Sequence, residues 1–134
     1  MGRHKKHLAM AMACCMAMAS CAAMDIEAYT PEGLLKRQQA GEAVSLSFFA
    51  KWCATCLMQE RVFRKFKGDA SVPGTLLVVD YDQSHQIMQS LHVHAQSTLI
   101  VYKGHAERHR SGGLTDPQAL KRALQSAHAD LKAP

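Results

Sequence analysis

Two cysteines separated by two residues are the part of this sequence best suited to chemistry. Cys53 and Cys56 follow a β-branched and aromatic run and precede a stretch with helical spacing. A cysteine at a helix N-terminus faces unpaired backbone N–H groups and the positive end of the helix dipole, and both lower the pKa of its thiol. A second cysteine one turn later can form or resolve a disulfide with it. The spacing predicts a redox pair, with Cys53 as the exposed nucleophile and Cys56 as the buried resolving thiol.

Other uses of the pair are open at this point. A structural disulfide closing so short a loop constrains the unfolded chain only slightly. A zinc site of four cysteines would need a second pair, which the chain lacks. His92 and His94 are two residues apart, so in an extended segment both rings point the same way. Together with Cys53 and Cys56 they would suit zinc or copper(I), and a metal-binding module is therefore the alternative function.

The segments that must position the pair alternate between helix and strand. We expect a helix from Thr30 to Gly41, a strand over 43–49, a helix from the cysteines to Gly68, a strand over 75–81, a short helix over 84–91, a strand over 98–102, a tight turn into 106–110 and a last helix after residue 115. The strand over 75–81 is apolar throughout, as in the interior of a parallel sheet. The alternation predicts an α/β sandwich with a mixed sheet.

Apolar residues at helical spacing predict the buried faces of these helices. Met58, Val62 and Phe66 would form one face of the helix after the cysteines. The last helix would begin at a cap on residue 115 or 116, with Leu120, Leu124 and Leu131 on its inner face.

Residues 1–24 have the composition of a secretory signal peptide. A basic segment over 2–7 precedes an apolar stretch over 8–19 and then small residues. Residues 1–20 hold three basic residues and no acidic one, so without them the net charge falls from +5 to +2. The rest shows no basic stripe interleaved with aromatic residues, and we predict no nucleic-acid partner. We expect a signal peptide over 1–24 and one domain over 25–134.

Residues 18–21 also resemble a bacterial lipobox, in which small residues precede a cysteine that becomes lipidated. Here that cysteine is Cys21, and Met18 departs from the usual Leu. Plain cleavage after Ala19 or Ala22 fits the small-residue rule as well. We expect export to the periplasm, either as a lipid-anchored protein or as a soluble one.

The segment over 48–56, which contains Trp52-Cys53-Ala54-Thr55-Cys56, resembles the active site of thioredoxin-like proteins. Residues 79–82, 97–104 and 112–114 resemble further segments of that superfamily, in the same order. The resemblance covers roughly residues 28–130 and implies a thioredoxin fold, with a central mixed sheet flanked by helices. It also implies thiol–disulfide exchange with protein partners and no organic cofactor.

The resemblance assigns roles to residues away from the cysteines. Trp52 would flank the pair and shield one face of the nucleophile. Ser97 stands where the family has a cis-proline, and with Thr98 and Gly112 it would face the substrate. A non-proline cis bond costs about 2.5–4 kcal/mol, so we expect Ser97 to be trans or strained, with a hydroxyl that can hydrogen-bond a thiolate.

Two positions that carry an acid in related proteins indicate how the resolving thiol loses its proton and which subfamily the sequence resembles most. The buried acid that assists the resolving thiol in thioredoxin aligns with Ser47, and Glu60 is a candidate substitute. Glu60 also makes the segment most similar to the C-terminal domain of DsbD-type membrane reductases. We therefore expect a reductant rather than an oxidant, with a membrane thiol reductase of the DsbD type as electron donor. A degenerate thioredoxin-like scaffold without turnover is a third hypothesis, against which the intact Cys pair argues.

Overall fold

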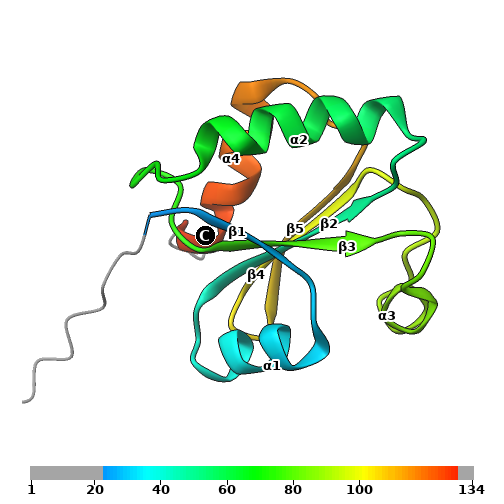
Figure 1. Cartoon of the computed structure of the whole chain (residues 1–134). Helices are drawn as coiled ribbons and strands as arrows, with labels where there is room; N and C mark the ends of the chain where they lie inside the picture. Colours follow the sequence, from blue (N-terminus) through cyan, green and yellow to red (C-terminus); the bar gives the residue numbers. More distant parts are fainter. Residues whose placement is uncertain (1–22, 130–134) are drawn as a thin grey trace, which may run out of the picture.

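A five-stranded mixed sheet forms the centre of the molecule (Figure 1). The structure is a computed structural model of the whole chain, and it describes residues 23–129. Over these residues the strands are β1 (Asp25–Ala28), β2 (Ala43–Phe49), β3 (Thr75–Asp80), β4 (Thr98–Lys103) and β5 (Ala106–Gly112), in the order β1-β3-β2-β4-β5. β1, β3 and β2 are parallel, whereas β4 runs antiparallel to β2, and β5 to β4. The prediction of a mixed sheet is confirmed.

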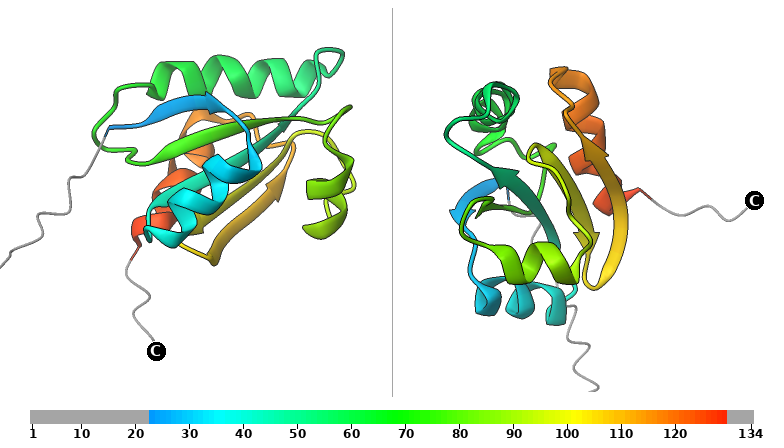
Figure 2. Two further views of the ribbon diagram at one scale, coloured as in Figure 1. Left: turned by 60° about the horizontal axis from the view of Figure 1, so that its bottom comes forward. Right: turned by 90° about the vertical axis from the view of Figure 1, so that its right-hand side faces the viewer.

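Helices cover both faces of this sheet. They are α1 (Pro31–Gln39), α2 (Ala54–Phe66), α3 (His85–Ser90) and α4 (Pro117–Gln125), followed by a 3-10 turn over Ser126–His128. α2 and α4 lie on one face, and α1 and α3 on the other (Figure 2). The predicted strands and helices over residues 30–125 therefore exist, with ends that differ from the predictions by one or two residues.

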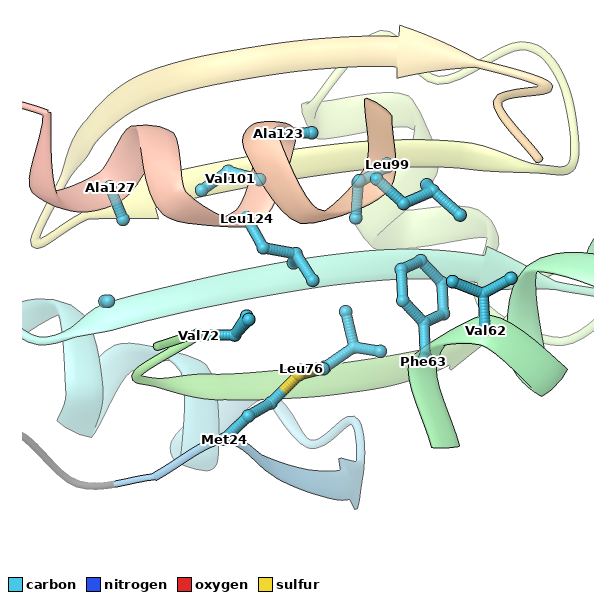
Figure 3. Close-up of a cluster of buried hydrophobic side chains, with 12 residues drawn as sticks. Met24, Val62, Phe63, Val72, Leu76, Leu99, Val101, Ala123, Leu124 and Ala127 are labelled. Atoms are coloured by element: carbon cyan, nitrogen blue, oxygen red, sulfur yellow. The ribbon is translucent and has the colours of Figure 1, made fainter. Parts of the chain in front are cut away.

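The central strands are mostly apolar because both of their faces are buried, with Ser45 and Ser47 as the buried polar residues of β2. Leu76 and Leu99 point toward α2 and α4, where they pack with Phe63 (Figure 3). Their neighbours Leu77 and Ile100 point the other way, into the cluster under α1 and α3. This alternation places the C-terminal end of β2, and the cysteines after it, on a rigid base.

Local details of the helices differ from the predictions. The buried face of α2 carries Cys56, Gln59, Val62 and Phe63, and Met58 is exposed, so the prediction of a buried Met58 is wrong. The face is rotated toward Gln59, whose amide donates to the carbonyl oxygens of Ser97 and Leu114. Asp116 caps α4 by accepting the N–H of Ala119. Leu131 lies outside the described residues.

Two strands had not been predicted. β1 has the sequence Asp-Ile-Glu-Ala and only one partly buried residue, so its strand character comes from pairing with β3 rather than from its own composition. β5 forms over the segment predicted as a turn, with an irregular register opposite Val101 and Tyr102.

Within residues 23–129 no helix is long and apolar enough to cross a membrane. The leader over 1–22 and Cys21 lie outside the described residues, so the predicted signal peptide and lipid anchor stay predictions.

Candidate functional site

Cys53 is the N-cap of α2. Its backbone is extended, with φ −92° and ψ 108°, and its Sγ accepts the backbone N–H of Cys56 at 3.1 Å. β2 ends at Phe49, and a short turn carries the chain from the sheet to this cap. Cys53 and Cys56 form a disulfide, with Cα atoms 5.2 Å apart. The cysteine that the sequence assigns as nucleophile therefore lies on the positive end of a 13-residue helix.

Both cysteines are buried in this disulfide form. Cys53 is 5% exposed and Cys56 is 2% exposed, and they pack with Ala50, Phe49 and Tyr81. The prediction of an exposed Cys53 is wrong here, because the β2–α2 turn and the loop before β4 cover the sulfur. The prediction of a buried Cys56 is confirmed.

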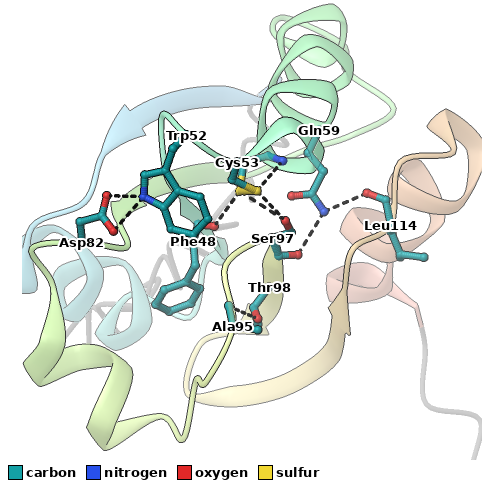
Figure 4. The surroundings of a disulfide bond; sticks show 10 residues. Phe48, Trp52, Cys53, Gln59, Asp82, Ala95, Ser97, Thr98 and Leu114 are labelled. Carbon is teal, nitrogen blue, oxygen red and sulfur yellow. Dashed lines mark hydrogen bonds between the residues drawn. A yellow bond between two sulfur atoms is a disulfide. The ribbon is translucent and has the colours of Figure 1, made fainter.

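Ser97 lies directly against the disulfide. Its Oγ is 3.2 Å from Sγ of Cys53 and 3.3 Å from Sγ of Cys56 (Figure 4). All peptide bonds of the described residues are trans, and Ser97 has φ +63°, in the left-handed region. The expectation of a trans or strained backbone is confirmed. The hydroxyl reaches both sulfurs of the disulfide, and its hydrogen bond to a thiolate stays a prediction.

Trp52 lies beside the pair and is tied to an acid. Its indole N–H donates to both carboxylate oxygens of Asp82, at 2.9 and 3.1 Å (Figure 4). Its ring meets that of Tyr81 edge-on. The side chain is 62% exposed, so it presents an apolar surface to solvent next to the buried disulfide. Nothing in the sequence indicates the bond to Asp82, because that residue is 30 positions away.

Glu60 and Ser47 are brought together, although neither is a hydrogen-bond partner of the sulfurs among the described residues. Both line a hollow of about 230 Å³ between α2 and the sheet. Ser47 is buried, and Glu60 is ion-paired with Arg64 at 2.7 Å. Glu60 thus lines the same hollow as Ser47, the residue that aligns with the family's buried acid, and its role in proton transfer stays a prediction.

Thr98 and Gly112 lie opposite each other in the β4–β5 ladder, next to Ser97. They line an open groove with His92 and His94, and the Thr98 hydroxyl donates to Ala95 O at 2.7 Å. Both histidines are exposed, and residues 23–129 contain no group of three or more His, Cys, Asp or Glu side chains placed to hold a metal ion. The metal-binding alternative is therefore not favoured.

Gln59 is a residue of the site that the sequence reasoning missed. Its side chain is 1% exposed, and its amide donates to the carbonyl oxygens of Ser97 at 3.1 Å and Leu114 at 2.8 Å (Figure 4). The available signal was its spacing: it lies three residues after Cys56 and four before Phe63, on the buried face of α2.

Taken together, these contacts make a site for thiol–disulfide exchange. A cysteine pair at a helix N-terminus, with a hydroxyl donor on its sulfurs and an exposed aromatic beside it, can attack and resolve a disulfide without a cofactor.

Comparisons with known proteins agree with this chemistry. The family model "Thioredoxin" matches residues 32–126. The chain is 37% identical to a thioredoxin of Chlamydia trachomatis over 82 residues, which are 60% of this chain and 78% of that protein. It is 35% identical to Thioredoxin-2 of Saccharomyces cerevisiae over 83 residues, 62% of this chain and 78% of that protein. The crystal structure of Trxlp from Edwardsiella tarda superposes with a TM-score of 0.70 at 33% identity, covering 75% of this chain and 98% of that one.

The chain belongs to the thioredoxin family. The predicted thioredoxin fold is confirmed, and the protein is a thiol–disulfide oxidoreductase with Cys53 and Cys56 as its Cys-x-x-Cys pair. The finer similarity to DsbD-type domains stays a prediction.

Proposed function

We propose that the protein reduces disulfides of protein partners, with Cys53 as nucleophile and Cys56 as resolving thiol. The observation that carries this assignment is the unequal surroundings of the two sulfurs. The Ser97 hydroxyl reaches both sulfurs, and Sγ of Cys53 in addition accepts the N–H of Cys56, a hydrogen bond that stabilises a thiolate. Sγ of Cys56 lies 3.7 Å from the carbonyl oxygen of Phe48, which can accept a hydrogen bond from a thiol but not from a thiolate. On reduction, the negative charge therefore favours Cys53 and the proton favours Cys56.

The exchange then proceeds in two balanced steps. The Cys53 thiolate attacks one sulfur of a partner disulfide, which forms a mixed disulfide and releases the other partner sulfur as a thiolate that takes a proton. Cys56 loses its proton and attacks Sγ of Cys53, which restores the Cys53–Cys56 disulfide and releases the second partner thiolate. Two electrons pass from the protein to its partner. One of the two protons that the partner thiolates take up comes from Cys56, and the other balances the proton that Cys53 released on forming its thiolate.

Trapping of partners tests this order of attack. With Cys56→Ser the second step is blocked, so partner proteins should accumulate on Cys53 as adducts that reductant releases. Cys53→Ser is the matched control and should trap none. Equal trapping by both variants would contradict the assigned roles, and no adduct with either would contradict the proposed function.

We propose that the open groove beside Ser97 receives an extended segment of the partner. Thr98 and Gly112 line it, and it lies along the loop that touches both sulfurs. Gly112→Val would narrow the groove, so it should raise the KM for a disulfide-containing protein while leaving the reduction of a small disulfide reagent unchanged. Equal losses with both substrates would argue against a role in substrate binding.

Glu60 is proposed as the group that takes the proton from Cys56 during resolution. Its support is the hollow that it shares with buried Ser47. Glu60→Gln should slow release of the mixed disulfide and change its pH profile, whereas Glu42→Gln, on the exposed turn after α1, should do neither. An unchanged pH profile would leave Glu60 as a helix acid paired only with Arg64.

We further propose that the protein works in the periplasm, is kept reduced by a membrane thiol reductase of the DsbD type and is anchored through lipidated Cys21. The support is the basic, apolar and then small composition of residues 1–24. The mass of the mature N-terminus, compared with that of Cys21→Ser, distinguishes the two forms. Acyl groups lost in the variant would support the anchor, and unmodified termini in both would support a soluble exported protein.

A further inference from the structure

Gln59 is a buried amide at the centre of the site with no assigned role. Its Nε2 donates to two carbonyl oxygens that belong to separate loops, Ser97 before β4 and Leu114 after β5. A buried polar side chain is costly unless it is hydrogen-bonded, and an apolar residue would fill the same space in the interior of α2 without that cost. Packing alone therefore does not explain why this buried position of α2 carries an amide.

Ser97 is held in place from several directions. Its N–H donates to Phe48 O at 2.9 Å, and its carbonyl accepts the N–H of Gly113 at 3.1 Å as well as the amide of Gln59. A residue other than glycine at φ +63° is disfavoured and persists where the surroundings impose the conformation. These three hydrogen bonds impose it, and Gln59 supplies the one that comes from a side chain.

The direction in which Ser97 donates follows from the disulfide. Neither sulfur carries a hydrogen in that form, so the hydroxyl that lies 3.2 and 3.3 Å from them must be the donor. After reduction the same hydroxyl can donate to the Cys53 thiolate, and a hydrogen bond to a charged group is stronger than one to a neutral group. The backbone conformation of Ser97 sets where that hydroxyl points.

We propose that Gln59 is a positioning residue for the exchange reaction: it fixes the Ser97 carbonyl, and so keeps the Ser97 hydroxyl on the Cys53 sulfur. The proposal rests on the proposed function, in which Cys53 is the nucleophile. Loss of the Gln59 amide should lower the acidity of the Cys53 thiol although Gln59 touches neither sulfur. The effect passes through Ser97, and it should vanish when the hydroxyl is already absent.

A double-mutant cycle tests this coupling. The full-length protein is compared with Gln59→Leu, Ser97→Ala and the double variant. The pKa of Cys53 is measured from the thiolate absorbance and from the rate of alkylation as a function of pH. The reduction potential is measured by equilibration in glutathione buffers. Gln59→Met is the second variant, because its flexible side chain fills the space should leucine fail to fold. Gln125→Leu is the control, since Gln125 also donates to a backbone carbonyl, that of Ser71, away from the site.

Ser97→Ala should reduce the acid dissociation constant of Cys53 about tenfold, and Gln59→Leu about three- to tenfold. Loss of thiolate stabilisation disfavours the reduced form, so a tenfold change lowers the potential by about 30 mV. In the Ser97→Ala background the Gln59 substitution should add nothing, and Gln125→Leu should change neither quantity.

Two results would overturn the proposal. One is an unchanged pKa and potential in the Gln59 variants, with only a loss of stability like that of the control. The other is an effect of equal size with and without the Ser97 hydroxyl, which would show that Gln59 does not act through it. Failure of the proposed function is a separate outcome, because the unsubstituted protein would then show no reversible dithiol couple.

Discussion

The left-handed backbone of Ser97 makes a prediction about stability that is independent of catalysis. Glycine adopts φ +63° without steric cost, whereas alanine keeps the clash of Cβ with the backbone, roughly 1–2 kcal/mol. Ser97→Gly and Ser97→Ala lose the same hydroxyl, so the comparison between them isolates the backbone. Glycine loses more entropy on folding, which offsets about half of the gain. The glycine variant should therefore be the more stable by about 0.5–1 kcal/mol.

Urea unfolding of the oxidised variants measures this difference. At a slope of about 2 kcal/mol per molar urea, the midpoint of Ser97→Gly should lie about 0.25–0.5 M above that of Ser97→Ala. Ser126 is the matched control, because it has φ −59° and its glycine variant should be less stable than its alanine variant by about 0.5–1 kcal/mol. Equal midpoints at position 97, or the same order at both positions, would refute the reasoning about a strained Ser97.

Three further predictions concern other parts of the molecule. Asp82→Ala should free the indole of Trp52, the only tryptophan, so its fluorescence should become more accessible to acrylamide and less anisotropic; unchanged values would contradict the hydrogen bond. Burial lowers the pKa of His109 below 6.5, so the unfolded chain binds its proton more readily and stability should fall as the pH drops below that value. His109→Gln should flatten this dependence of the urea midpoint, and an unchanged slope would exclude the effect. Gly74→Ala should lose about 1–3 kcal/mol of unfolding free energy, because Gly74 has φ +111° and a Cβ would meet Ala43 O at 2.6 Å; a smaller loss would mean that the turn relaxes.

The features that the sequence predicted are those encoded locally. The strand over Thr75–Asp80 is apolar at every residue but its ends, and that pattern follows from burial on both faces. The Cys-x-x-Cys pair lies between a strand and a helix, so its place at a helix N-terminus could be inferred from neighbours alone. The structure contains both features because tertiary packing agrees with the local preference of these segments.

The features that escaped prediction depend on contacts between distant segments. Asp25–Ala28 becomes a strand only because β3 offers it a partner. Gln59 and Ser97 are 38 residues apart, and nothing in the composition of either segment indicates that an amide on α2 meets the carbonyl before β4. Met58 is exposed and Gln59 is buried, the reverse of what their polarity predicts. The reason is that α2 turns the Gln59 amide toward two buried carbonyl groups.

The redox equilibrium of Cys53 and Cys56 is the most direct test of the central claim. The purified protein is equilibrated in glutathione buffers of varied ratio, and its free thiols are alkylated and counted by mass. We expect one reversible two-electron couple that both Cys53→Ser and Cys56→Ser abolish, with a potential of about −200 mV or below, as for a reductant. A value near −120 mV would contradict the proposed direction, and the absence of any reversible two-thiol couple would contradict the claim itself.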